Sequence, residues 1–139
     1  MEEFADLEAR QEALVRALVG GAELPEGFDG ATVGAASRAL LRKRFGEVLH
    51  AWPALIAHRA EFLSWAEGRP PRGSLLDGWD FARAYRGVLS RDALAALALR
   101  EALWRYDGVA ARRRRLPAVR VFRRGVAVAG FGRARAWAR

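Results

Sequence analysis

Apolar side chains recur every three or four residues along most of this 139-residue chain, which is the spacing of a helix with one buried face. The first such stripe covers residues 2–19, with carboxylates early and a stop at Gly20-Gly21. A second stripe begins near Thr32, a candidate N-cap, and runs to Ala51. The pattern therefore predicts two long helices joined by a loop.

A proline and a glycine-rich loop divide the helical region that follows. Pro53 disfavours helical geometry at the preceding residue, so we expect a break there and a third helix that ends at Gly68. Two prolines and two glycines within residues 68–74 exclude regular structure in that segment. A short helix then carries Trp79, and Ser90 caps a fifth helix. The apolar face of this fifth helix contains Leu94, Leu97, Ala98, Ala102 and Trp104.

Beyond residue 111 the apolar spacing changes to that of β-strands. Two short runs rich in valine flank Arg124-Gly125 and predict a β-hairpin around a two-residue turn. An isolated hairpin is marginally stable in water, so it must pack on the helices or gain a strand from a partner. We therefore expect a mainly α protein: a five-helix body in residues 1–111, followed by a small Arg-rich β-hairpin tail in residues 112–139. The hairpin runs contain Val119, Val121, Phe122, Val126, Val128 and Phe131.

The formal net charge of +8 is unevenly distributed along the chain. All 16 acidic residues lie before residue 108, so residues 1–111 carry a net charge of −2, from 14 basic and 16 acidic side chains. Residues 112–139 contain ten arginines and no carboxylate, which gives this segment a charge of +10. An unbalanced cationic segment at one end of a nearly neutral body is placed to meet an anionic partner.

Two kinds of partner fit this cationic tail. Side chains two residues apart on a strand share a face, so arginines beside an unpaired strand edge can hold an acidic extended peptide by strand addition. The same arginines can instead contact nucleic-acid phosphates. The basic linker is Arg112, Arg113, Arg114 and Arg115. The candidate peptide-binding residues are Arg120, Phe122, Arg123, Arg124, Arg133, Arg135 and Trp137.

Few residue patterns suggest catalysis. The chain has no cysteine, which excludes thiol nucleophiles and thiolate metal sites. The pairs Glu47-x-x-His50 and His58-x-x-Glu61 have metal-like spacing, but Pro53 breaks the helical register between them, so ordinary solvated histidines are expected. Neither a phosphate-binding glycine loop nor a nucleophile elbow occurs. We therefore expect a protein that is not an enzyme and has no metal and no cofactor.

The start of the chain bears on its location. Its first ten residues are acidic and amphipathic, and they lack the cationic start and apolar stretch of a secretory signal. The longest apolar run, residues 93–99, is far shorter than a membrane span. We expect a cytoplasmic protein without a membrane partner.

The middle of the chain contains a series of motifs that resembles a known family. Trp52-Pro53 follows a basic helix, then come Pro70-Pro71-x-x-Ser74-Leu75-x-x-Gly78-x-x-Phe81 and Leu97-Ala98-x-x-Glu101. Together they resemble the helical domain of the partner proteins of multinuclear iron-dependent oxidative enzymes. The structural motif comprises Trp52, Pro53, Pro70, Pro71, Gly78, Phe81 and Glu101.

This resemblance implies a function. The family pairs with enzymes that modify ribosomally made peptides, and its helical domain has been labelled a DNA-binding domain. It implies a non-catalytic adaptor that forms a heterodimer with the iron-dependent enzyme, which carries the iron, and that docks the acidic precursor peptide on its C-terminal β portion. A small nucleic-acid-binding regulator, contacting phosphates through the same arginines, stays open as the alternative.

Overall fold

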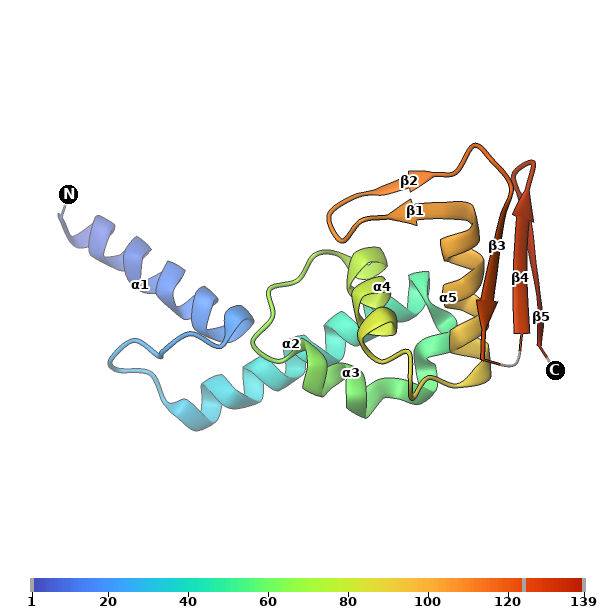
Figure 1. Cartoon of the computed structure of the whole chain (residues 1–139). Coiled ribbons are helices and arrows are strands. Elements are labelled where there is room, and N and C mark those ends of the chain that lie inside the picture. Colours follow the sequence, from blue (N-terminus) through green and yellow to red (C-terminus); the bar gives the residue numbers. More distant parts are fainter. Residues whose placement is uncertain (1, 124, 139) are drawn as a thin grey trace.

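The computed structural model describes residues 2–123 and 125–138, and over these residues the chain is mainly helical with a C-terminal β region, as expected (Figure 1). The helices are α1 (Glu2–Gly20), α2 (Gly30–Ala51), the 3-10 helix η1 (Pro53–His58), α3 (Arg59–Ala66), α4 (Ser74–Ala84) and α5 (Arg91–Leu103). The strands are β1 (Trp104–Tyr106), β2 (Ala111–Arg113), β3 (Ala118–Phe122), β4 (Gly125–Gly130) and β5 (Arg133–Ala138). None of the helices in the described part of the chain is long and apolar enough to cross a membrane.

Local signals set the ends of the helices. α1 ends at Gly20, and Gly21 follows with a φ of +67° that favours glycine. The N-cap of α2 is Asp29, whose carboxylate accepts the backbone N–H groups of Ala31 and Thr32. The prediction that Thr32 is the cap is wrong, because an acidic side chain three residues earlier already binds these donors.

The break at Pro53 is confirmed, but the segment after it is not one continuous α-helix. α2 ends at Ala51, and Pro53 occupies the first position of η1, where its missing N–H costs nothing. α3 begins only at Arg59. Ser90 caps α5 as predicted, because its hydroxyl accepts the backbone N–H of Ala93 at 3.3 Å.

Aromatic side chains from α2, α3 and α4 fill the core of the helical body. Trp52, Phe62, Trp79 and Phe81 are all fully buried, and the ring centroids of Phe62 and Phe81 lie 5.3 Å apart. The indole N–H of Trp52 donates to the backbone carbonyl of Leu75 at 2.9 Å. The core thus joins the end of α2 to the start of α4.

The tail is more than the single hairpin that the sequence predicts. β1 and β2 form a two-stranded antiparallel sheet, and β3, β4 and β5 form a three-stranded antiparallel sheet in that order. Trp104 begins β1 instead of extending the apolar face of α5, and Gly108 lies between β1 and β2. Phe131, expected in a strand, is in the turn between β4 and β5 with a φ of 50°. The expected boundary between residues 111 and 112 falls inside β2.

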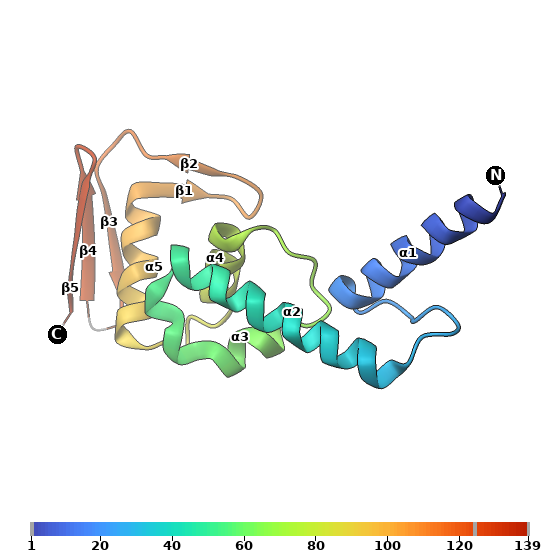
Figure 2. The same ribbon diagram turned by 180° about the vertical axis from the view of Figure 1, so that it is seen from behind.

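Alanines connect the three-stranded sheet to α5. Ala98 and Ala102 of α5 form one buried cluster with Ala127 and Ala129 of β4. Such small side chains let the helix and the sheet approach closely. Seen from both sides, the sheet lies at one end of the molecule and α1 at the other (Figures 1 and 2).

Candidate peptide-docking site

The strand register divides the three-stranded sheet into two faces. Arg120, Ala127 and Ala136 are paired across the sheet, and their row faces α5. Because successive side chains of a strand alternate, the neighbouring rows point the other way. The side chains on this outer face are Val119, Val121, Val126, Val128, Arg133, Arg135 and Trp137.

The candidate peptide-binding residues therefore do not share one face. Arg120 and Phe122 lie on the side of the sheet that faces α5. Arg123 follows β3 and is exposed. Arg124 lies outside the described residues. The other three candidates, Arg133, Arg135 and Trp137, lie on the outer face and are exposed.

A groove of about 470 Å³ runs between β3 and α5. Leu94 and Leu97 of α5 and Phe122 of β3 supply apolar side chains to its wall, and Arg86 and Arg123 supply positive charge. Phe122 and Arg123 are candidate residues from the sequence, whereas Arg86, Leu94 and Leu97 are not. The arrangement can hold an extended segment with apolar side chains and carboxylates.

β3 forms one edge of the three-stranded sheet. The carbonyl of Val119 accepts a hydrogen bond from the guanidinium of Arg120 at 3.3 Å, so it points away from the ladder with β4. Alternate residues of an antiparallel strand direct their backbone groups to the same side, so the N–H and C=O of Val121 also point outward. This edge offers backbone donors and acceptors beside the groove.

The Arg112–Arg115 run is folded. Arg112 and Arg113 lie in β2. The Arg114 backbone N–H donates to the carbonyl of Leu103 at 2.8 Å, and its side chain donates to the carbonyl of Glu101 at 3.0 Å. Burial, together with the positive charges of Arg120 and Arg105, lowers the pKa of Arg114. Arg114 thus binds the last carbonyls of α5, while Arg115 is exposed.

The motif residues of the helical body make internal contacts. Trp52 and Phe81 are core side chains, and Pro53 starts η1. Gly78 lies against the indole of Trp52: a Cβ there would stand 2.6 Å from Nε1. Its φ is not in the left-handed region, so this close approach, rather than backbone conformation, is what requires glycine.

Ion pairs fix the loops of the body. Glu101 accepts hydrogen bonds from Arg83 at 2.7 Å and from Arg86 at 2.8 Å, and so ties α5 to α4 and the segment after it. The guanidinium of Arg44 donates to buried Asp77 at 2.8 Å and to the carbonyl of Arg69 at 2.6 Å. It also lies 3.4 Å from the carbonyl of Pro70, next to Pro71, which explains how the proline loop is held on α2.

The two histidines have different environments. His50 is exposed, whereas His58 is buried and its Nε2 accepts the backbone N–H of Ser90 at 2.9 Å. The expectation of a solvated side chain is therefore wrong for His58, because the start of α5 packs over it. Glu61 lies 3.9 Å from His58 Nδ1. Within the described ranges, no group of three or more histidines and carboxylates is placed to hold a metal ion.

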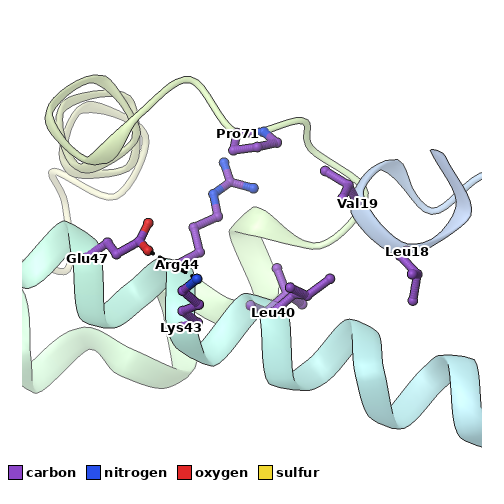
Figure 3. Close-up of a pocket in the computed structure, with 8 residues that line it drawn as sticks. Leu18, Val19, Leu40, Lys43, Arg44, Glu47 and Pro71 are labelled. Carbon is purple, nitrogen blue, oxygen red and sulfur yellow. Dashed lines mark ion pairs between the residues drawn. The ribbon is translucent and has the colours of Figure 1, made fainter. Parts of the chain in front are cut away.

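A second hollow, of about 190 Å³, lies on the helical body between the end of α1, α2 and Pro71 (Figure 3). Apolar side chains, among them Leu18, Val19 and Leu40, line it beside the charged ends of α2 residues. Lys43 and Glu47 form an ion pair of 3.9 Å at its rim. The hollow can take an apolar side chain from another protein.

Comparison with known proteins places the helical body in a family. The family described as SCO6045-like, C-terminal domain matches residues 8–87, which is 80 of the 139 residues. The matched range runs from α1 through α4 and ends before α5 and the β strands. No solved structure matches.

A relative shows the same kind of segment within a larger protein. A UPF0276 protein from Streptomyces avermitilis is 41% identical over 78 residues, which cover 52% of this chain and 16% of the relative. The chain therefore corresponds to a small part of that protein. With more than half of its residues matched, the chain belongs to the SCO6045-like, C-terminal domain family.

Proposed function

We propose that this chain is a non-catalytic adaptor that binds an iron-dependent oxidative enzyme through its helical body and docks an acidic precursor peptide on its C-terminal sheet. The observation that carries the proposal is the outward-facing edge of β3 beside an apolar groove with arginines. The iron would belong to the enzyme.

The similarity to part of a longer protein supports a role in binding another protein. In the UPF0276 protein, the matching segment is a minor part of a much longer chain. A segment that is covalently joined to a larger protein in one case can bind a partner protein non-covalently in another. The matched range covers α1 through α4 of the helical body, so we assign the enzyme contact to this part, which includes the apolar hollow beside Pro71.

The edge of β3 defines the form of the peptide. A strand added there would exchange backbone hydrogen bonds with Val119 and Val121, the residues whose polar groups point outward. Half of its side chains would face α5 and meet Leu94, Leu97 and Phe122 in the groove. Small or apolar residues suit these alternate positions.

The arginines near the groove favour a peptide with acidic side chains. Arg86 and Arg123 line the groove, and Arg120 lies against the edge through its contact with the Val119 carbonyl. Carboxylates on the peptide would pair with these groups, replacing the internal contact of Arg120 and sharing Arg86 with Glu101. Individual exposed ion pairs contribute only about 0–1 kcal/mol, so the charges select the partner while the backbone pairing supplies most of the affinity.

The peptide test uses the full chain and fluorescence anisotropy with an extended probe that alternates valine and glutamate. Val121→Pro removes an outward N–H at an edge position where proline is tolerated, so binding should weaken by at least about tenfold. Val121→Thr keeps the N–H and serves as the matched control. Equal binding by both variants, with unchanged circular dichroism, would show that the β3 edge is not the docking site.

The enzyme test is co-purification with an iron-dependent oxidative enzyme encoded near this chain. A Leu40→Glu variant, which places a charge in the hollow beside Pro71, should lose the enzyme but keep the peptide probe. An Arg38→Glu variant on the exposed part of α2 is the control for the change in charge. Failure of the wild-type chain to retain any such enzyme would contradict the adaptor proposal.

The nucleic-acid alternative rests on the same arginines and makes a different prediction. Binding to DNA or RNA would weaken steeply with added salt, because phosphate contacts release counterions. It would not respond to Val121→Pro, since the loss of one backbone donor leaves the positive charge unchanged. Sequence-selective DNA binding at about 0.15 M salt, unaffected by the proline, would favour a regulator over an adaptor.

A further inference from the structure

The outer face of the three-stranded sheet, opposite α5, is exposed and apolar. We infer that it binds helix α1 of a second copy of this chain. The inference rests on two exposed apolar faces of opposite charge, one at each end of the molecule, and does not depend on the peptide proposal.

The outer face is unusually apolar for a solvent-exposed surface. Val119, Val121 and Trp137 are 56%, 78% and 58% exposed, and the register places them with Val126 and Val128 on one continuous surface. An antiparallel sheet packed on one face usually carries polar side chains on the other. Contiguous exposed valines beside a tryptophan are typical of a protein-binding surface.

The charge of the outer face indicates what covers it. Arg133 and Arg135 lie on it beside the valines and are exposed. The sequence contains no carboxylate after Asp107 that could balance them. Two such sheet faces would repel each other, so the occupant must combine apolar side chains with acidic ones.

Helix α1 has this combination. Residues 2–12 contain five carboxylates and one arginine. Phe4, Leu7 and Val15 share one face of the helix and are 75%, 51% and 57% exposed. The acidic side chains of Glu8 and Glu12, one turn apart, are exposed beside this stripe. A stripe with these properties is complementary to the outer face in both polarity and charge.

The two surfaces cannot meet within one chain. α1 extends from the helical body at the end opposite the sheet in both views (Figures 1 and 2). A second copy can supply what one copy cannot: its α1 would cover the outer face, and its own sheet would receive another α1. This contact lies on the outer face of the sheet, whereas the groove lies between β3 and α5; the two surfaces share Val121.

Light scattering during size-exclusion chromatography of the full chain tests the inference. Over an about hundredfold concentration series, the mass should rise from the 15.4 kDa of one chain to at least twice that value. Arg133→Glu with Arg135→Glu, or Glu8→Arg with Glu12→Arg, should each weaken self-association by at least about tenfold, because each change places like charges opposite one another. Arg38→Glu with Arg42→Glu changes the net charge by the same amount and sign as the sheet variant, on exposed α2 positions, and should have no effect.

Mixing the two charge-reversed variants gives the decisive measurement. The basic α1 of one variant matches the acidic sheet of the other, so the mixture should associate more strongly than either variant does alone. A wild-type chain that stays monomeric throughout overturns the inference, as does a mixture that does not recover association. Association of the wild type that appears only with added nucleic acid would also overturn it, since phosphates would then be the ligand of this face.

Discussion

At the scale of single residues, the packing of Trp52 against Gly78 shows how little space the helical core leaves. The indole N–H is bound to the carbonyl of Leu75, so the ring cannot move away without losing that hydrogen bond. A methyl group at Gly78 would overlap the ring. This contact accounts for glycine in the Gly78-x-x-Phe81 motif.

We expect Gly78→Ala to lower the free energy of unfolding by about 1–3 kcal/mol, because overpacking a buried contact forces side chains or backbone to shift. Urea denaturation measures the change. Gly46→Ala in α2 is the control, because among the described residues nothing beyond its chain neighbours and the backbone of its own helix lies within 4 Å of the added methyl. That variant should be neutral or slightly stabilised, since alanine favours helix more than glycine does. Equal stability of Gly78→Ala and wild type would contradict this account of the core.

His58 is a second residue whose role is internal. Its Nε2 accepts the Ser90 backbone N–H at the start of α5. We expect His58→Phe, which fills similar space without an acceptor, to destabilise the fold by about 1–3 kcal/mol, since it leaves a partly buried donor unpaired. His50→Phe changes an exposed histidine and should alter stability little. A comparable loss of stability in both variants would mean that the hydrogen bond from Ser90 does not stabilise the fold.

At the scale of elements, Tyr106 attaches the β1–β2 sheet to α4. Its hydroxyl donates to Asp80 at 2.6 Å, and its ring lies 4.7 Å from that of Trp79. Arg72 donates to the same Asp80 at 2.8 Å. Burial, and then the hydrogen bond to Asp80, raise the pKa of Tyr106 above its ordinary value of 10.0.

This raised pKa predicts a loss of stability at alkaline pH. Above pH 10 the unfolded chain releases the Tyr106 proton while the folded chain still holds it, so the unfolded state binds fewer protons and stability falls as the pH rises. Urea unfolding at about pH 9 and about pH 11 measures the difference. Tyr106→Phe should remove this part of the pH dependence, with Tyr85→Phe as the control. If stability depends on pH in the same way in Tyr106→Phe, other titrating groups cause this dependence.

The elements that sequence reasoning finds are those with local signals. Gly21, Pro53 and Ser90 each end or begin a helix through their own backbone or side-chain chemistry, so these boundaries are predictable. Trp104 is assigned wrongly because its spacing continues the apolar face of α5. β5 is missed because arginine and alanine alternate in it, without the branched side chains that mark a strand.

The candidate site is predictable only in part, for a related reason. Phe122 and Arg123 can be found from the strand pattern and the charge of the tail. Leu94 and Leu97 look like ordinary core residues of α5, and only the packing of β3 against that helix turns them into the wall of a groove. Arg114 looks like one of four linker arginines, yet it binds carbonyls at the end of α5 through a contact that no local pattern reveals.

At the scale of the whole molecule, the sheet and the helical body differ in what holds them. The body contains large interlocked aromatic rings, whereas the contact of the sheet with α5 centres on alanines. Alanine removes much less apolar surface from water than phenylalanine or tryptophan does. The sheet should therefore open more easily than the body.

Native-state hydrogen exchange can measure this difference. We expect the amides of β4 to exchange through a local opening whose free energy is lower than that of global unfolding, while amides of α4 exchange only on global unfolding. Ala127→Gly removes a buried methyl and should speed exchange in β4 without changing α4. Exchange of β4 only through global unfolding would show that sheet and body form one cooperative unit.

The alanine contact between α5 and the sheet also bears on how such a chain can be rebuilt. Because the fully buried centre of this contact holds only alanines, with Leu99, Leu103 and Phe122 packed around it, the position of the sheet on α5 depends on matching shapes mainly at its border. A designer could exchange the strands for others with a different outer face and edge, provided that Ala127, Ala129 and Phe122 stay at their inward positions and Arg114 still closes α5. The helical body would then serve as a scaffold for sheets with different binding surfaces.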